Sequence, residues 1–185
     1  ANSVLGGIGD DSMAANGGND TMDGGAGNDT ILAGDGQNSV LGGSENDNIV
    51  SGSGNDTINA GTGNDSVDAG DGNNTVFGGA GDDTLVLRDT GGSTGVADGH
   101  LDSHDFAGLH GGDGYDTLLV QGDDVTLDFS RITAGTVTGI EGIDLTAHGA
   151  QHVILSLDDL ASSDTGSLAV VFGEDPVGYD KYPRD

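Results

Sequence analysis

Apolar residues recur at every ninth position along the first half of the chain. Counted in units of nine from Gly6, the eighth residue is always apolar, at Met13, Met22, Ile31, Val40, Ile49, Ile58, Val67, Val76 and Leu85. The residue before it is polar in every unit, as in a short strand with one buried face. Gly, Asn and Asp dominate the first six residues of each unit and favour turns. A period of nine predicts a solenoid. We therefore expect an all-β fold, a right-handed parallel β-roll over residues 1–86.

The turns repeat the pattern G-G-x-G-x-D, which is rich in oxygen ligands. Position six carries Asp11, Asp20, Asp29, Asn38, Asp47, Asp56, Asp65, Asn74 and Asp83. Seven units keep glycine at positions two and four, at Gly7, Gly9, Gly25, Gly27, Gly34, Gly36, Gly52, Gly54, Gly61, Gly63, Gly70, Gly72, Gly79 and Gly81. Glycine lets backbone carbonyls crowd a ligand, and carboxylate with carbonyl oxygens is the set that Ca²⁺ prefers. We predict that all of these residues bind calcium.

Two units depart from the pattern. Asn16 stands at position two of its unit and Glu45 at position four of its unit, where the others have glycine. Both substitutions predict an altered local turn geometry. The carboxylate of Glu45 is also a candidate additional oxygen ligand.

Charge decides whether this half of the chain folds by itself. The net charge is −28, and residues 1–87 hold no Lys or Arg, because the four basic residues are Arg88, Arg131, Lys181 and Arg184. Two carboxylates about 5 Å apart repel by roughly 3 kcal/mol at an effective dielectric of about 20. We therefore expect disorder without calcium and folding on binding the ion. The charge argues against nucleic acid and anionic membranes as partners, and no apolar run suits membrane insertion.

Successive turns of a roll fall on opposite edges, so turns on the same edge are two nonapeptides apart. One edge, the all-Asp edge, then carries Asp11, Asp29, Asp47, Asp65 and Asp83. The other, the mixed edge, alternates as Asn2, Asp20, Asn38, Asp56 and Asn74. We expect about eight calcium ions, about four at each edge. The all-Asp edge should fill first, because more ligand charge means tighter binding.

The alternation comes with a longer period. NSVLGG occurs at 2–7 and again at 38–43, and NTVFGG follows at 74–79, each four nonapeptides after the last. This indicates duplication of a four-repeat block. Residues 1–5 match the last five positions of a repeat, so we expect the sequence to begin inside a longer array.

Residues 87–110 break the period and predict an excursion loop. GGSTG surrounds Ser93 with a G-x-S-x-G pattern, but the strand and helix that a catalytic serine needs are not evident. His100 and His104, with two nearby Asp residues, could bind a transition metal, although a solvated loop is favoured. GGDGYDTLL at 111–119 then returns to the repeat. If the loop replaces one mixed-edge turn, Asp116 should pair with Asp83 and extend the calcium ligands.

Residues 111–185 predict the final repeat and a β-rich cap, which a solenoid needs to cover its last coil. Strands are expected over 125–129, 137–145, 153–157 and 168–172. A short helical turn is expected over 158–162. The Asp-Pro bond at 175–176 is interpreted as a turn rather than as a self-cleavage site.

The nonapeptides resemble those of the RTX family of exported bacterial proteins. The segment GGDGYDTLLV, with GIEGIDLT at 139–146 and ILSLDDL at 154–160, resembles the carboxy-terminal region of large RTX adhesins. The resemblance implies export by type I secretion machinery, and a secreted or cell-surface location. It also implies calcium-driven folding outside the cell, so we expect a non-catalytic calcium-binding module of an adhesin.

Two other functions stay open at this stage. The roll could be the accessory module of a secreted hydrolase, protease or epimerase, whose catalytic domain would lie upstream. Its outer surface could instead bind ice or glycans, since Asn is common at position five. Position three varies, however, from Ile8 to Asp35 to Thr62, and a regular binding face needs both columns to be regular.

Overall fold

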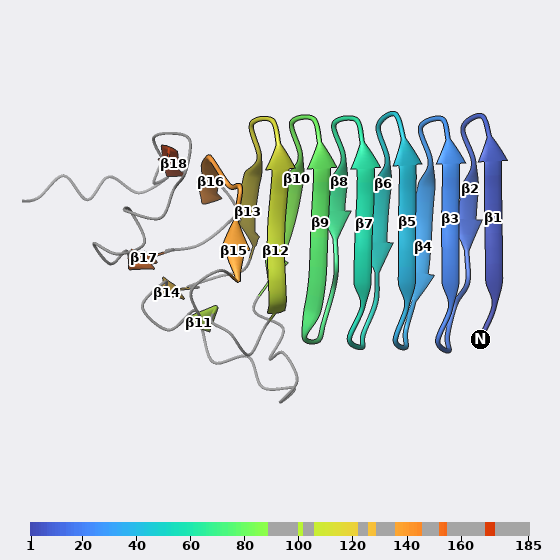
Figure 1. The fold of residues 1–185 in the computed structure, drawn as a ribbon. Helices are drawn as coiled ribbons and strands as arrows, with labels where there is room; N and C mark the ends of the chain where they lie inside the picture. The colour runs from blue at the N-terminus through green and yellow to red at the C-terminus, as the bar shows by residue number, and fades with distance from the viewer. Residues whose placement is uncertain are drawn as a thin grey trace, which may run out of the picture.

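The computed structural model describes residues 1–88, 100–101, 106–121, 126–128, 136–145, 152–154 and 169–172. Every regular element in these residues is a β-strand, and the strands pair in parallel throughout. Two long sheets face each other across a thin core, and the chain passes from one to the other at each turn (Figure 1). The predicted parallel β-roll is confirmed.

The first sheet runs in the order β1-β3-β5-β7-β9-β12-β15. Its strands are β1 (Ser3–Ile8), β3 (Thr21–Ala26), β5 (Ser39–Ser44), β7 (Thr57–Thr62), β9 (Asn74–Ala80), β12 (Phe106–Asp113) and β15 (Val137–Thr138). Each of these strands through β12 leads into a turn of the all-Asp edge.

The second sheet runs in the order β18-β16-β13-β10-β8-β6-β4-β2. Its strands are β2 (Ser12–Ala14), β4 (Thr30–Gly34), β6 (Asn48–Ser51), β8 (Ser66–Asp68), β10 (Thr84–Arg88), β13 (Thr117–Gln121), β16 (Gly142–Leu145) and β18 (Ala169–Phe172). A small third sheet pairs β11 (His100–Leu101), β14 (Thr126–Asp128) and β17 (His152–Ile154).

The register places equivalent residues of alternate repeats side by side. Met22 pairs with Val40 in the first sheet, and Ile31 pairs with Ile49 in the second, so partners in both sheets are two nonapeptides apart. Two nonapeptides therefore make one coil. This confirms that the position-six residues sort into two columns on opposite edges.

The core follows the nine-residue period. All nine apolar residues at position eight are buried, from Met13 at 7 % exposed to Ile58 at 0 %. Position one adds small side chains that the pattern did not predict as core, since Ala33 and Ala60 are fully buried. Neighbouring apolar residues such as Leu32 and Phe77 face outward. In the repeats the core is thus built from the position-eight side chains, with small side chains added at position one.

Strand length in the first sheet differs from the prediction. The pattern predicts short strands at the end of each unit, but β3 spans six residues and continues through Gly24 and Gly25 into position three of the next repeat. Gly25 pairs with Gly43 of β5, so glycines that favour turns are paired in a sheet here. The stacked backbone of neighbouring coils supplies partners that an isolated turn would lack.

Asn16 and Glu45 both lie in the left-handed region, with φ of 71° and 73°. The angle at Asn16 matches Gly34 and Gly70, which hold position two on the same edge with φ of 78° and 71°, and Asn tolerates this region better than most residues. The glycines at position four of the other units have φ from 99° to 131°, so the turn at Glu45 differs from theirs, and Glu45 carries a conformational cost that the surrounding stack of turns must offset. The expectation of altered local geometry is therefore wrong at Asn16 and confirmed at Glu45.

The return of the repeat after residue 110 takes the predicted place. β13 pairs with β10, and Thr117 lies opposite Thr84. The excursion predicted over 87–110 is shorter at both ends, because β10 continues to Arg88 and β12 already begins at Phe106. β10 lies in the second sheet and β12 in the first, as do the strands before and after each mixed-edge turn.

The strand predicted over 137–145 is instead two strands in different sheets. β15 pairs with β12, and β16 pairs with β13, so residues 139–141 form a turn between them. The strands predicted over 125–129, 153–157 and 168–172 coincide, in their described residues, with β14, β17 and β18. Together these strands extend all three sheets beyond the repeats.

Several predictions fall on residues outside the described part of the chain. They concern Ser93, His104, the helical turn at 158–162 and the Asp-Pro bond at 175–176, and the side chain of His100 is likewise not described. In the described part, no helix has the length and apolar character that crossing a membrane requires.

Candidate metal centre

The all-Asp edge is a continuous column of carboxylates held by the backbone. In each turn the backbone N–H of the position-six residue donates to Oδ1 of the position-six Asp one coil further along. The donors are Asp11, Asp29, Asp47, Asp65 and Asp83, at 2.8 or 2.9 Å, and the last acceptor is Asp116. The predicted pairing of Asp116 with Asp83 is confirmed, since Asp83 N–H donates to Asp116 Oδ1 at 2.8 Å.

The second carboxylate oxygen in this column has no hydrogen-bond partner. Oδ2 is buried and unpaired in Asp11, Asp29, Asp47, Asp65, Asp83 and Asp116. From Asp29 onward these residues are 3 % exposed or less. An ionised oxygen that is buried without a partner is strongly unfavourable. Each turn of this edge therefore needs a positive charge beside Oδ2.

The backbone brings another oxygen to the same place. A Cβ atom on Gly24 would lie 2.4 Å from Asp29 Oδ2 and 2.4 Å from the carbonyl oxygen of Gly42 in the next turn. The same pair of oxygens, one carboxylate and one carbonyl, recurs at Gly6, Gly42, Gly78 and Gly111. These position-one carbonyls were missed as candidate ligands from the sequence, although the glycine at position one was a signal for them.

Burial makes these carboxylates hard to ionise while no cation is near. It raises the pKa of Asp47 to about 6, and the charges of Asp65 and Asp29 add to the rise. It raises the pKa of Asp83 to about 6 as well, with Asp65 and Asp116 acting in the same direction. In both residues the hydrogen bond from the preceding backbone N–H opposes the shift. The closed column thus favours protons or cations beside it.

The arrangement suits a hard cation with oxygen ligands. Among the residues that the structure describes, no three His, Cys, Asp or Glu side chains converge on one point. A bound ion must therefore take much of its shell from backbone carbonyls, together with the Asp oxygens. Ca²⁺ accepts six to eight oxygens in flexible geometry, whereas Mg²⁺ demands a small octahedral shell. The residues present fit calcium.

The mixed edge is built differently at its Asn turns. Asn38 still accepts the N–H of Asp20 on Oδ1, at 3.0 Å. Its amide nitrogen, however, donates to the carbonyls of Gly34 at 2.8 Å and Gly36 at 3.3 Å. These two glycines were predicted as calcium ligands, and here a neutral side chain of their own turn already occupies them. The Asn amide takes the role that a cation has in an Asp turn.

The same exchange occurs at Asn74, whose amide nitrogen donates to Ala69 O and Gly70 O, both at 3.2 Å. At Asp56, the hydroxyl of Ser51 donates to Oδ2. Among the described position-six residues of this edge, Asp20 keeps the unpaired buried Oδ2. The predicted sites of the mixed edge are therefore largely satisfied by the chain itself.

Position five adds a second, exposed ladder that runs in the opposite direction. Asn28 N–H donates to Asp10 Oδ1 at 2.8 Å, and Asn46 N–H donates to Asn28 Oδ1 at 3.2 Å. Here the acceptor lies one coil earlier, whereas at position six it lies one coil later. Each turn is thus fastened to both of its neighbours.

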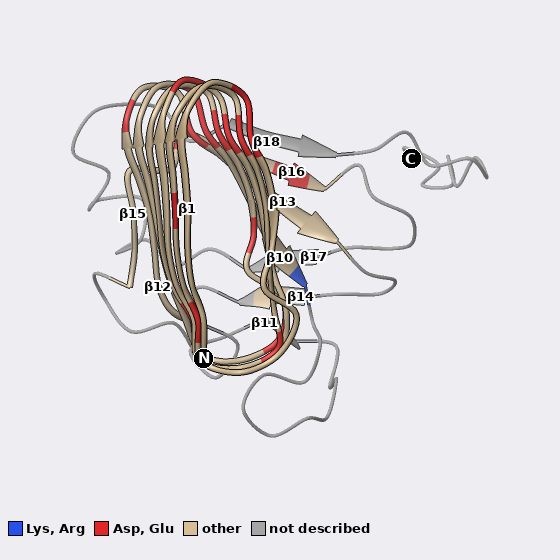
Figure 2. Cartoon of the chain, turned by 90° about the vertical axis from the view of Figure 1, so that its right-hand side faces the viewer, with Lys and Arg blue, Asp and Glu red and all other residues tan. Residues whose placement is uncertain are grey.

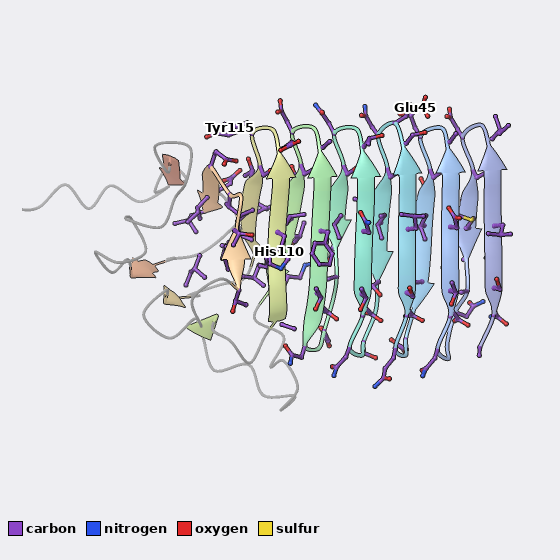
Figure 3. All side chains as sticks on the ribbon, in the orientation of Figure 1. Glu45, His110 and Tyr115 are labelled. Carbon is purple, nitrogen blue, oxygen red and sulfur yellow. The ribbon has the colours of Figure 1, made fainter. Side chains whose placement is uncertain are left out.

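Glu45 points away from the column. Its Oε2 accepts the N–H of Gly27 at 2.7 Å and contacts the hydroxyl of Ser44 at 3.1 Å, on the exposed side of the turn. Figure 3 shows its side chain at the outer surface of the same row of turns. It therefore does not supply the additional ligand that the sequence suggested.

Acidic residues gather along the row of turns at the top of Figure 2, which is the all-Asp edge. The one described Lys or Arg, Arg88, lies away from it and pairs with Asp68 at 2.6 Å. No described basic side chain neutralises the column. As the sequence indicates, the carboxylates of this edge have no Lys or Arg beside them in the described part of the fold.

Glu141 is a further carboxylate at this edge that sequence reasoning did not select. Its Oε2 accepts the backbone N–H of Asp116 at 3.0 Å, the same bond that each Asp of the column makes. The signal was the pair of glycines in G-I-E-G at 139–142. It was hidden because Glu141 does not stand at the nine-residue period.

Comparison with known proteins identifies the repeats. A family model described as the RTX calcium-binding nonapeptide repeat (4 copies) matches residues 1–31, 15–49 and 50–85. No curated protein and no solved structure matches the chain. The matched range ends where the period of nine first breaks.

Proposed function

Because residues 1–85 are RTX calcium-binding nonapeptide repeats, we propose that the chain is a non-catalytic module that folds when it meets extracellular calcium. The observation that carries this proposal is the row of buried, unpaired Oδ2 atoms on the all-Asp edge. With calcium, these oxygens become ligands and the roll is stable. Without it, the same oxygens favour the open chain.

In this proposal binding free energy is folding free energy. The Asp carboxylates and the carbonyls of neighbouring turns come together only in the closed roll, so the unfolded chain holds the ion poorly. In the low calcium of a cell interior the chain stays extended. In extracellular calcium it closes into a rigid rod.

The two edges have different tasks. Sites of the all-Asp edge bind first, since each offers a free carboxylate oxygen and a carbonyl from the next turn. The Asn turns of the mixed edge hold themselves through Asn38 and Asn74. The total of about eight ions, and the order of filling, are testable by titration.

The wider setting of the module is part of the same proposal. The resemblance of the nonapeptides to those of exported RTX proteins implies a secreted protein, and the segment after residue 111 resembles that of large adhesins exported by type I machinery. We assign the chain to such an adhesin, in which it supports export unfolded and folding outside the cell. The chain catalyses nothing in this role, and its partners are calcium ions and the secretion machinery.

Circular dichroism of the chain with calcium and with a calcium chelator tests the proposal. We expect strand signal with calcium and a disordered spectrum with chelator, reversible on adding calcium again. The Asp65→Asn variant should need more calcium for half-maximal folding, whereas Asp71→Asn, which removes an exposed charge from position three, should behave like the unmodified chain. A spectrum that stays fully folded in chelator would falsify the proposal.

A further inference from the structure

The last turn of the all-Asp edge is shorter than the others. Leu109 of β12 pairs with Val137, whereas Thr117 of β13 already pairs with Gly142. Paired residues of these two coils are therefore three residues closer in sequence in the second sheet than in the first. The turn that connects β15 to β16 is shorter than the earlier turns by those three residues. It consists of residues 139–141 alone, in a segment that the family model does not match.

Despite its length, this turn reproduces the hydrogen bonds of a repeat. In each earlier turn the position-seven N–H donates to the carbonyl of the preceding position-six Asp, as Thr117 does to Asp83 at 2.7 Å. Gly142 N–H donates to Asp116 O at 2.9 Å in the same way. Glu141 therefore occupies the place of a position-six Asp, and its longer side chain still accepts the N–H of Asp116 at 3.0 Å.

The oxygen pair found beside each turn of the column is also present. A Cβ on Gly111 would lie 2.4 Å from Asp116 Oδ2, and the Gly139 carbonyl oxygen is even closer to that point. Asp116 is fully buried, and its Oδ2 has no hydrogen-bond partner. A site of the column is thus present beyond the last repeat, with Gly139 in the place of the next position-one residue.

We propose that Gly139 and Glu141 complete a terminal calcium site with Asp116. This rests on the proposed calcium binding of the column and adds to it a site that lies outside the nonapeptides. The glutamate is a ligand supplied by the cap, so the same ion that fills the last turn fastens the cap to the roll.

The charge of Glu141 is what favours a ligand over a simple hydrogen-bond acceptor. A neutral Gln could accept the N–H of Asp116 equally well. A carboxylate instead adds negative charge beside Asp116, which is fully buried and whose Oδ2 has no hydrogen-bond partner. Such a pair is unfavourable by itself and favourable with a cation between its members.

Calorimetric titration of the full chain with calcium tests the proposal. We expect Glu141→Gln to bind one ion fewer than the unmodified chain. The matched control is Asp113→Asn, which removes one exposed charge from the neighbouring turn that carries Asp116 and should leave the number of ions unchanged. If the unmodified chain binds calcium and Glu141→Gln binds the same number equally tightly, the terminal site is wrong while the proposed function stands.

A second variant keeps the test decisive if Glu141→Gln folds poorly. A ligand role requires the charge, so Glu141→Asp should fold at lower calcium than Glu141→Gln. A purely structural role requires length and a neutral acceptor, so Glu141→Gln should then match the unmodified chain and Glu141→Asp should be the worse of the two. The calcium concentration at half-maximal circular dichroism gives this order, and the second order would overturn the proposal.

Tyr115 offers a spectroscopic readout at the same place. It precedes Asp116, its hydroxyl lies 3.2 Å from the Cβ position of Gly142, and its side chain lies at this end of the roll in Figure 3. Terbium, an oxygen-seeking substitute for calcium, should luminesce when Tyr115 is excited, and Tyr115→Phe gives the background. Glu141→Gln should lower the emission that depends on Tyr115, and unchanged emission would contradict the terminal site.

Discussion

At position six, Asp has a second carboxylate oxygen where Asn has an amide NH₂ group. This difference decides whether the turn offers a free ligand oxygen for a cation. Both use Oδ1 to accept the N–H of the coil before. The second polar atom is an acceptor in Asp29 and has no donor, whereas in Asn38 it is a donor and reaches Gly34 O at 2.8 Å. An Asn turn thus carries internally the positive group that an Asp turn must take from solution.

Replacing Asn38 with Asp should convert a self-satisfied turn into a binding turn. The change removes the N–H donor to Gly34 and Gly36 and adds a buried charge, which destabilises the calcium-free roll. We expect one more calcium ion per chain and a folding transition that is steeper in calcium, measured by calorimetry and circular dichroism.

The control for that change is Asn55→Asp. Asn55 is exposed at position five, and its Oδ1 accepts the N–H of Asn73 at 3.0 Å, which an Asp can also do. It adds the same charge without touching a turn interior and should leave the ion count as it was. An unchanged count in Asn38→Asp would mean that the mixed edge cannot be converted by one residue.

The sequence predicted the position-six residues and their two columns, but not the direction in which each amide points. The nine-residue period assigns Asn38 and Asp56 to one edge because sorting by repeat number is enough for that. The Asn38 amide can donate to Gly34 O only because the backbone of its turn folds back toward it. The residue pattern of the repeat does not specify this backbone path. The sequence therefore located these residues on their edge, whereas the hydrogen bonds of Asn38 came from the structure, and calcium binding by each residue of that edge stays a prediction.

At the scale of elements, the apolar period located the strands and the glycines obscured their ends. Gly24 and Gly25 favour a turn in isolation, yet β3 continues through them because β5 supplies its hydrogen bonds. The segment 137–145 was predicted as one strand because the turn inside it is only residues 139–141. A turn this short does not repeat the nine-residue pattern that marks the other turns. Pairing between coils decides both cases, and pairing is not local in sequence.

The carboxylate column should respond to acid as one element. The folded pKa values of Asp47 and Asp83 are raised from 3.8 to about 6, so between these values the closed roll binds more protons than the open chain. The stability that this contributes is present below about pH 4 and is lost as the pH rises through about 6. Protons thus partly replace calcium.

In chelator, lowering the pH from about 7.5 to about 5 should therefore increase the strand signal in circular dichroism, since protonation near the folded pKa favours the closed column. Near about pH 5, where protonation already favours the closed column in chelator, calcium binding should release protons, seen as a dependence of the calorimetric heat on buffer. The double variant Asp47→Asn, Asp83→Asn should show a smaller acid effect. Loss of strand signal on acidification would contradict this interpretation of the column.

For the whole molecule, the formal charge of −28 sets the behaviour of the open chain. An unfolded chain of this length has a radius of gyration of roughly 46 Å, and self-repulsion extends it further. Closing the roll gathers the carboxylates into a column about one strand spacing apart, about 4.8 Å. Screening alone weakens repulsion but fills no ligand position.

Calcium and simple salt should therefore act differently on overall size. Small-angle scattering should show the radius of gyration falling at least about 1.5-fold with calcium, because the roll closes. Sodium chloride at about 1 M in chelator, which shortens the screening length to about 3 Å, should contract the chain only partly and give no strand signal. Magnesium at the ionic strength of the calcium sample is the control, and full compaction with it would argue against a calcium-specific site.

The alternation of the two sheets along the chain has a consequence for how its length can change. Deleting one nonapeptide would move every later turn to the opposite edge. Turns of the mixed edge, including Asn turns, would then continue the all-Asp column, and Glu141 would lie on the mixed edge. Losing two keeps each column continuous, and losing four also keeps the order of Asp and Asn on the mixed edge. The sequence repeats with a period of one nonapeptide. The molecule can keep both columns and their order of Asp and Asn, however, only if it is lengthened or shortened by four nonapeptides at a time.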